Sequence, residues 1–371
     1  MKFIRPLTGV TQKLHYTGNL LQQFATLIVG TDQTYFPGSV QKSRWSIFRD
    51  HVLWIIRNQE INRFYYVYGL DRKHQQKSAG IISYRRFRRM RNRTNLRPQG
   101  IDFNYACLFR DKFIFAQFLK SLGFPTPKNI ALLDNEGVTW LHTMERDSYE
   151  SILERGDKPV NAFCKKLRGI RGEGAFPLRV EGGKIFSGEQ QLSAAELKHK
   201  LDGTYLLQER IMQHADMARL HPESINTIRI VTFNNQGKVE LFFAAVRVGT
   251  DRRNVDNWNA GGIAIAVDTT TGTLRSQGLQ KWCYGKLADK HPDTGITFEG
   301  YKIPYFEESV ELVRNVHSYL YGMHSIGWDV AITVNGPTII EANEDWDGSF
   351  AMFSEDNFKD KFLKMFDELG R

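Results

Sequence analysis

The chain has 371 residues, 41% of them hydrophobic and 25% charged, so it can bury a large core and is neither fibrous nor disordered. Its three cysteines, Cys107, Cys164 and Cys283, are widely separated, which argues against a disulfide framework or a thiolate zinc site and is typical of a reducing compartment. No apolar run approaches the roughly 20 residues that span a bilayer, so we expect a cytoplasmic protein.

The net charge of +9 is concentrated at one end of the chain. Residues 1–100 hold 18 Lys and Arg against 4 Asp and Glu, and the remainder holds 32 against 37. The densest part is the run Tyr84-Arg85-Arg86-Phe87-Arg88-Arg89. Such a run is typical of surfaces that bind nucleic acid, anionic glycans or acidic lipid headgroups, and equally of a solvated helix face. No nucleic-acid-binding motif accompanies it, so nucleic acid is disfavoured and contact with an anionic membrane stays open.

The N-terminal region reads as mainly helical. From Gln41 to Leu70, apolar residues recur at helical spacing, and Tyr65 to Tyr68 reads as a short strand or buried segment. Next comes an amphipathic helix from Asn104 to Leu122, which Gly123 and the following prolines end.

Short β-like runs dominate the middle of the chain. They cover Ile130 to Leu133, Ala162 to Lys165, Thr204 to Glu209, Ser224 to Phe233, Val239 to Val248 and Gly262 to Val267. Helices are predicted over residues 306–323 and 357–369, on either side of a final strand pair. Many strands with few interposed helices favour an α+β fold over a doubly wound parallel sheet.

The final strand pair carries the most informative residues, Asp329, Glu341 and Asn343. Oxygen-bearing side chains at the ends of apolar runs are what a magnesium ion requires, and charged residues are rarely placed there without a partner. Glu341 and Asn343 share one face of a strand because side chains alternate with a period of two. The alternative is that both are merely edge or turn residues.

The register of this pair decides whether Asp329 joins that face. A two-residue turn at Asn335-Gly336 sets Asp329 opposite Ala342, which points away. We therefore predict one irregularity, either a longer turn or a bulge, that sets Asp329 opposite Asn343 and diagonal to Glu341.

Three weaker features suit a nucleotide. Lys165 and Lys166 end a strand before Gly169, Gly172 and Gly174, and glycines let backbone N–H groups approach phosphate, although this is not a Walker loop and an ordinary surface turn also fits. The segment Leu206-Leu207-Gln208-Glu209-Arg210-Ile211 leaves a strand and could present backbone groups to adenine. Arg229 and Arg247 lie within apolar strands and need an anionic partner, either a carboxylate or a phosphate.

Together these motifs resemble the ATP-grasp superfamily and, within it, the sugar-transfer-associated ATP-grasp family. The resemblance spans roughly residues 101–350. It is carried by Ser224-Ile225-Asn226-Thr227-Ile228-Arg229-Ile230, Val246-Arg247-Val248-Gly249 with Val255-Asp256-Asn257 and Gly261-Gly262, His291-Pro292-Asp293-Thr294-Gly295 with Ile303-Pro304, Ile326-Gly327-Trp328-Asp329, and Gly336-Pro337-Thr338-Ile339-Ile340-Glu341-Ala342-Asn343.

The resemblance implies an ATP-grasp fold, with two α+β lobes sandwiching the nucleotide after a basic, mainly helical region over residues 1–100. The first lobe, with its glycine loop, is expected over residues 101–203, and the C-terminal lobe, with the adenine hinge and the magnesium site, over residues 204–371. The residues that it implies for ATP are Lys112, Lys165, Gly172, Gly174, Gln208, Glu209 and Ile211. For two magnesium ions it implies Asp329, Glu341 and Asn343, and for the γ-phosphate or an acyl-phosphate Arg229 and Arg247. Where the family's proline follows the second lysine, Lys166 stands here, so either lysine could face ATP.

The resemblance further implies a reaction in which a substrate carboxylate attacks the γ-phosphate of ATP and an amine or thiol then displaces phosphate, with Glu341 acting as a bridging ligand. The family name suggests surface-polysaccharide biosynthesis. A kinase would need the same phosphate and metal residues, and a basic nucleic-acid- or glycan-binding module is a third alternative. His214, His221 and His291 either lie near the acceptor or have structural roles.

Overall fold

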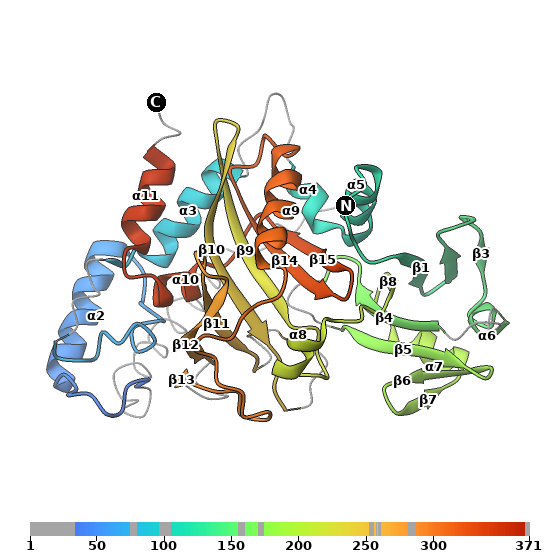
Figure 1. The fold of residues 1–371 in the computed structure, drawn as a ribbon, viewed down its shortest axis with the longest axis horizontal. Helices are drawn as coiled ribbons and strands as arrows, with labels where there is room; N and C mark the ends of the chain where they lie inside the picture. Colours follow the sequence, from blue (N-terminus) through green and yellow to red (C-terminus); the bar gives the residue numbers. More distant parts are fainter. Residues whose placement is uncertain are drawn as a thin grey trace, which may run out of the picture. The chain divides into compact units, whose positions relative to one another are not determined.

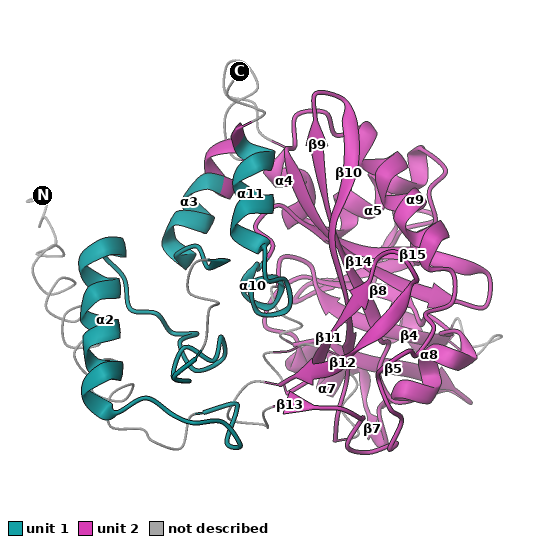
Figure 2. Ribbon diagram, turned by 60° about the vertical axis from the view of Figure 1, so that its left-hand side comes forward, with its two compact units in different colours: residues 1–90, 347–366 teal, residues 91–346, 367–371 magenta. Residues whose placement is uncertain are grey.

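The computed structural model describes residues 34–74, 80–95, 105–154, 160–169, 174–251, 256, 258, 261–280 and 287–367 (Figure 1). By its internal contacts the chain divides into two compact units, which Figure 2 colours separately. Unit 1 comprises Met1–Met90 and Asp347–Phe366, and unit 2 comprises Arg91–Trp346 and Asp367–Arg371. The division into residues 1–100, 101–203 and 204–371 stays a prediction.

The regular elements of unit 1 that the structure describes are helices, joined by turns and irregular segments. Unit 1 contains α2 (Arg44–Asn58), the first part of α3 (Tyr84–Asn95), α10 (Ser349–Ser354) and most of α11 (Phe358–Asp367). The aromatic ring of Phe87 on α3 lies 6.0 Å from that of Phe358 and 5.0 Å from that of Phe362 on α11, so residues at the two ends of the chain share one core. The predicted segment Tyr65 to Tyr68 is buried but forms turns instead of a strand.

Unit 2 contains an antiparallel sheet of eight strands, in the order β3-β2-β1-β8-β4-β5-β6-β7 (Figure 1). Its strands are β1 (Asn129–Asp134), β2 (Gly137–Trp140), β3 (Arg146–Asp147), β4 (Val160–Lys166), β5 (Phe176–Glu181), β6 (Lys184–Ser187), β7 (Gln190–Leu192) and β8 (Tyr205–Glu209). The short helices α6 (Ser151–Glu154) and α7 (Ala194–Lys200) contribute Ile152 and Leu197 to its core.

The second antiparallel sheet of unit 2 has the order β13-β12-β11-β10-β9-β14-β15. Its strands are β9 (Thr227–Asn235), β10 (Lys238–Val248), β11 (Ile263–Asp268), β12 (Thr273–Leu279), β13 (Leu287–Ala288), β14 (Ser325–Thr333) and β15 (Gly336–Asn343). The helix α9 (Phe306–Ser318) covers this sheet, and α8 (Ala215–Leu220) adds Met217 and Leu220 to the same core. Two antiparallel sheets with few helices confirm the α+β prediction.

The helix predicted from Asn104 to Leu122 is in fact two helices, α4 (Ala106–Arg110) and α5 (Lys112–Ser121). They break at Asp111, whose carboxylate accepts hydrogen bonds from the backbone N–H groups of Phe113 and Ile114, both at 3.1 Å, and so caps α5. Apolar periodicity alone could not reveal this break, which makes Lys112 the first residue of α5.

None of the helices described has both the length and the apolar character needed to cross a membrane.

Candidate active site

The β14–β15 hairpin aligns the predicted metal ligands. Its turn lies at Val334-Asn335, because Thr333 pairs with Gly336, and β15 carries one extra residue between the partners of Asp329 and Val330. Asp329 therefore pairs with Glu341, and Asn343 pairs with Gly327. The predicted irregularity is confirmed.

The predicted turn position and the predicted pairing of Asp329 with Asn343 are wrong. The Thr333 hydroxyl fixes the earlier turn, since it accepts from the Asn335 N–H at 3.0 Å and donates to the Gly336 carbonyl at 2.9 Å. The net register still brings Asp329 beside Glu341, with Asn343 diagonal to Asp329.

Two arginines surround Asp329 on neighbouring strands. Arg229, opposite it on β9, donates from Nε to Oδ1 at 2.6 Å and from Nη2 to Oδ2 at 3.1 Å, and Arg247 Nη2 lies 3.0 Å from Oδ2. Burial raises the pKa of Asp329, but the two guanidiniums outweigh it and hold that pKa below its usual value. Asp329, 4% exposed, is therefore an ionised carboxylate in a buried cationic setting.

Arg247 is also held from a second direction. Its Nε and Nη2 donate to the Thr227 hydroxyl at 3.1 and 2.8 Å, and that hydroxyl donates to the Asp256 carboxylate. The Thr227 backbone N–H donates to the same carboxylate oxygen at 3.0 Å. Burial lowers the pKa of Arg247, but the charges of Asp329, Asp256 and Glu341 outweigh it, so the pKa lies above its usual value.

Sequence reasoning missed these supporting roles of Thr227 and Asp256, although both stand in the motifs of the resemblance. The available signal was Thr227 itself, a polar residue two positions before the half-buried Arg229 on the same strand. Residues at this spacing share one face of a strand.

Two lysines, Lys112 on α5 and Lys165 on β4, are close enough to Glu341 to feel its charge. Lys112 Nζ donates to the Gly169 carbonyl at 2.7 Å and lies 3.4 Å from Glu341 Oε1. Lys165 Nζ donates to the Gln208 side-chain carbonyl at 3.1 Å. Burial lowers the pKa of Lys165 to about 8, with a further lowering from Lys112 and a partial offset from Glu341 and other carboxylates.

The side chains of Lys165 and Lys166 have different partners. Lys166 Nζ forms an ion pair with the Asp202 carboxylate at 2.7 Å, whereas Lys165 is close enough to Glu341 for that carboxylate to raise its pKa. Gln208, 3% exposed, also donates from Nε2 to Asn129 Oδ1 at 2.8 Å, so its side chain is fixed between a lysine and an amide. The side chain of Gln208 therefore orients Lys165, in addition to any role of its backbone in an adenine hinge.

The remaining predicted ATP residues are only partly defined by the structure. Glu209 is exposed and Ile211 half-buried, and they lie at the end of β8 and just beyond it. Gly174 has φ +69°, and a Cβ there would lie 2.7 Å from the Tyr205 hydroxyl oxygen, so only glycine fits. Gly172 lies outside the described residues. The roles of these four residues stay predictions.

The donor set suits a magnesium ion bound together with phosphate. Glu341 keeps 31% of its side chain exposed, and the side chain of Asn343 makes no hydrogen bond to any other described residue. Within the described part of the chain, no group of three or more His, Cys, Asp or Glu side chains is placed to hold a metal. Magnesium is commonly held by one or two carboxylates with phosphate oxygens completing its shell, which is the arrangement that fits here.

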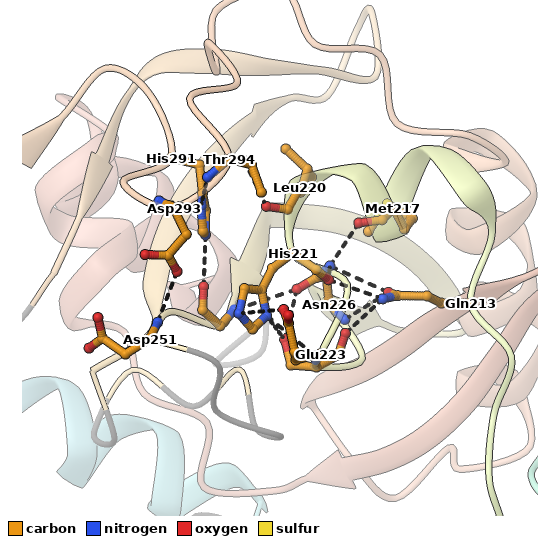
Figure 3. A network of polar contacts seen from close by, with 12 residues as sticks. Gln213, Met217, Leu220, His221, Glu223, Asn226, Asp251, His291, Asp293 and Thr294 are labelled. Atoms are coloured by element: carbon orange, nitrogen blue, oxygen red, sulfur yellow. Dashed lines mark hydrogen bonds and ion pairs between the residues drawn. The ribbon is translucent and has the colours of Figure 1, made fainter.

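The predicted histidines belong to the framework (Figure 3). His291 Nε2 donates to the Gly249 carbonyl at 2.8 Å, and His221 Nδ1 lies 2.8 Å from Ser224 Oγ. Both histidines are buried, and the His291–Gly249 bond together with the hydrogen bond from the Asp251 N–H to the Asp293 carboxylate at 2.9 Å holds residues 249–251 after β10. His214 caps α8, because its Nδ1 accepts from the Asp216 N–H at 3.2 Å.

Comparisons with solved structures return ATP-grasp enzymes at low similarity. D-alanine-D-alanine ligase from Helicobacter pylori is 15% identical over 70% of this chain and 61% of that chain, with a TM-score of 0.39. N5-carboxyaminoimidazole ribonucleotide synthetase from Thermotoga maritima is 15% identical over 64% and 42%, with a TM-score of 0.34. L-amino acid ligase from Bacillus licheniformis is 15% identical over 67% and 44%, with a TM-score of 0.35.

This chain thus spans less than two thirds of the length of each of these three proteins. No curated protein matches it. The sequence model described as sugar-transfer associated ATP-grasp matches residues 91–364, which cover Lys112, Lys165, both arginines and the β14–β15 hairpin. The chain belongs to the sugar-transfer-associated ATP-grasp family.

Proposed function

We propose that this chain is an ATP-dependent carboxylate–amine or carboxylate–thiol ligase that acts through an acyl-phosphate and releases ADP and phosphate. One observation carries the proposal. Four cationic side chains and two accessible oxygen donors converge around a buried, ionised aspartate. The cations are Lys112, Lys165, Arg229 and Arg247, and the donors are Glu341 and Asn343. This combination suits a triphosphate with bound magnesium. The cations can bind the phosphate oxygens, while the oxygen donors can bind the magnesium ion.

The reaction needs no nucleophile from the protein. A carboxylate oxygen of the substrate attacks the γ-phosphorus, the bond to the β-phosphate oxygen breaks, and ADP leaves. An amine or thiol then attacks the acyl carbon, phosphate leaves, and the attacking group loses a proton to solvent. Catalysis therefore rests on positioning and charge.

The side chains of this site divide the work. Lys112 and Lys165 supply positive charge for the phosphates, and Arg247, fixed by Thr227 and Asp256, supplies a guanidinium at a set position. Asp329, Glu341 and Asn343 would hold magnesium, which supplies neutralisation of the phosphate oxygens when bound. Glu209 and Ile211 would hold adenine through the backbone, and Gly172 and Gly174 would cover the phosphates.

The acceptor that we propose carries a carboxyl group. The family name suggests an amino acid joined to a uronic acid or to another carboxyl-bearing glycan, in surface-polysaccharide or related biosynthesis. Contact of the basic N-terminal region with an anionic membrane would suit an acceptor of that kind.

A nucleotide and phosphate balance tests the reaction class. Purified protein is incubated with Mg-ATP and a small-molecule extract of its native host, and ADP, AMP, free phosphate and pyrophosphate are quantified. ADP matched by free phosphate supports the ligase. ADP without free phosphate indicates a kinase, and AMP with pyrophosphate contradicts both reactions.

Two variants test whether the nucleotide turnover depends on the proposed site. Glu341→Ala should abolish nucleotide turnover, and Glu299→Ala, at an exposed carboxylate outside the site, should leave turnover unchanged. Equal loss in both variants would show that the activity does not come from the proposed site.

A further inference from the structure

The helix α2 (Arg44–Asn58) presents apolar side chains to solvent. Trp45 is 82% exposed, Ile56 70% and Leu53 39%. Their spacing places the three on one face of the helix, together with Arg49. We call this set the α2 outer face.

The opposite face of α2 is turned inward and carries both polar residues and the half-buried Ile47, Trp54 and Ile55. His51 is fully buried with its ring 4.4 Å from that of Tyr65. The Asp50 carboxylate accepts from the Tyr65 hydroxyl at 2.8 Å and from Lys42 Nζ at 2.6 Å. A usual surface helix turns its one apolar stripe towards the core, whereas α2 carries apolar residues on both faces. The exposed apolar residues of the outer face are therefore additional to those that pack inward.

Cations accompany the α2 outer face. Arg44, Arg49 and Arg57 are all exposed, and no carboxylate among the described residues pairs with Arg44 or Arg57. Arg85 Nη1 donates to the carbonyl of Gln59, the C-terminal cap of α2, at 3.0 Å, which places a further cation at that end. The one acidic residue of α2, Asp50, is engaged on the inner face. The outer face is thus apolar and basic together.

We propose that the α2 outer face docks on an anionic lipid bilayer, with the helix lying in the headgroup region. An apolar face flanked by arginines is the composition of interfacial helices, and a tryptophan side chain suits the boundary between headgroup and acyl chain. Anionic headgroups neutralise the arginines while Trp45, Leu53 and Ile56 leave water.

A second copy of this chain is the less suitable occupant. A two-fold contact through this face packs the patch of one copy against that of the other, so the arginines of both copies lie in one interface. Like charges placed together at an interface oppose association. The docking surface does not depend on the ligase reaction, because none of its residues belongs to the site around Glu341.

Vesicle sedimentation of the full chain tests the surface. Phosphatidylcholine vesicles with and without phosphatidylglycerol are compared, at low and high salt. The chain should sediment with the anionic vesicles, less so at high salt, and the double variant Trp45→Ser, Ile56→Ser should lower the partition coefficient at least about tenfold. Val334→Ser, which removes an apolar side chain that is 63% exposed from the β14–β15 turn, should leave it unchanged.

Several results would overturn the proposal. One is sedimentation that does not depend on phosphatidylglycerol or on the double variant. Another is a dimer in light scattering without lipid that the double variant dissociates, since it would assign the face to a second copy. No sedimentation and no dimer would show that another part of the chain covers the face. Circular dichroism and lipid-free phosphate release, both expected to be unchanged, show that the double variant folds.

Discussion

Asp329 and Glu341 lie directly opposite each other on β14 and β15, yet their surroundings differ. Asp329 is buried and bound by two guanidiniums, whereas Glu341 is partly exposed and lies 3.4 Å from a single lysine nitrogen. The pair therefore combines a carboxylate that also balances the charge of two arginines with one that is more exposed, and substitutions at the two positions should act differently.

Glu341→Gln should lower the turnover of ATP by about 100-fold or more while changing the free energy of unfolding by less than about 0.5 kcal/mol. The side chain is accessible, so its removal opens no cavity, but the amide cannot replace a charged oxygen donor. Steady-state phosphate release and urea unfolding measure the two effects. A variant with near-normal turnover would refute the assignment of Glu341.

Asp329→Ala should instead destabilise unit 2 by roughly 3–5 kcal/mol, because it leaves the half-buried Arg229 without its anion and Arg247 with Asp256 alone. Urea unfolding checks this loss directly. If the variant is as stable as the Glu341 variant, the two arginines do not depend on Asp329 for their charge balance.

Thr227→Val should reduce kcat/KM for ATP about tenfold, because it removes the oxygen that accepts two hydrogen bonds from Arg247. Thr227→Ser keeps that oxygen and should restore most of the activity. A purely structural role predicts loss of stability with unchanged kinetics in the folded fraction, so kinetics and thermal unfolding are compared for both variants.

The affinity for ATP should fall as pH rises through about 8, the pKa to which burial lowers Lys165. Below that pH the lysine is charged and favours phosphate, and above it the neutral amine does not. Bound phosphate raises the pKa of Lys165 in the complex, so the decline in affinity begins near pH 8 and ends at that higher pKa. Titration calorimetry between pH 6.5 and 9.5 should show this decline in the native chain, and Lys165→Met should bind weakly with no step near pH 8.

Acid should destabilise unit 2 in part through His317, which burial keeps neutral with a pKa lowered to about 4. Its Nε2 donates to the Met323 carbonyl at 2.9 Å, so Nδ1 accepts from the Thr232 hydroxyl at 2.7 Å. The unfolded chain takes up a proton near pH 6.5, so stability present above that pH is lost as the pH falls towards 4, by on the order of 3 kcal/mol. His317→Gln should be less stable at pH 7.5 and show a shallower acid dependence in urea unfolding between pH 7 and 4.

The strands and the chemistry of the site follow largely from local sequence. The runs around Ile130, Ile228 and Val246 are strands close to their predicted bounds, because apolar side chains at a period of two can be recognised within a few residues. The residue types needed for phosphate and magnesium are equally local, since Arg229 and Arg247 lie within two of these runs and the oxygen donors lie in the final strand pair.

Tertiary structure decided what depends on alignment between segments. The register of β14 and β15 depends on the exact position of the turn at Val334 and on the extra residue in β15. A shift of one residue at either place moves the side chains of one strand to the other face. The hydrogen bonds of Thr227 with Asp256 and Arg247 join distant positions, and the contacts of Asp50 with Tyr65 and Lys42 help to orient α2. Sequence alone determined which groups are available, whereas folding determined which of them meet, because hydrogen bonds and ion pairs form only between atoms that the packed backbone brings within about 3 Å.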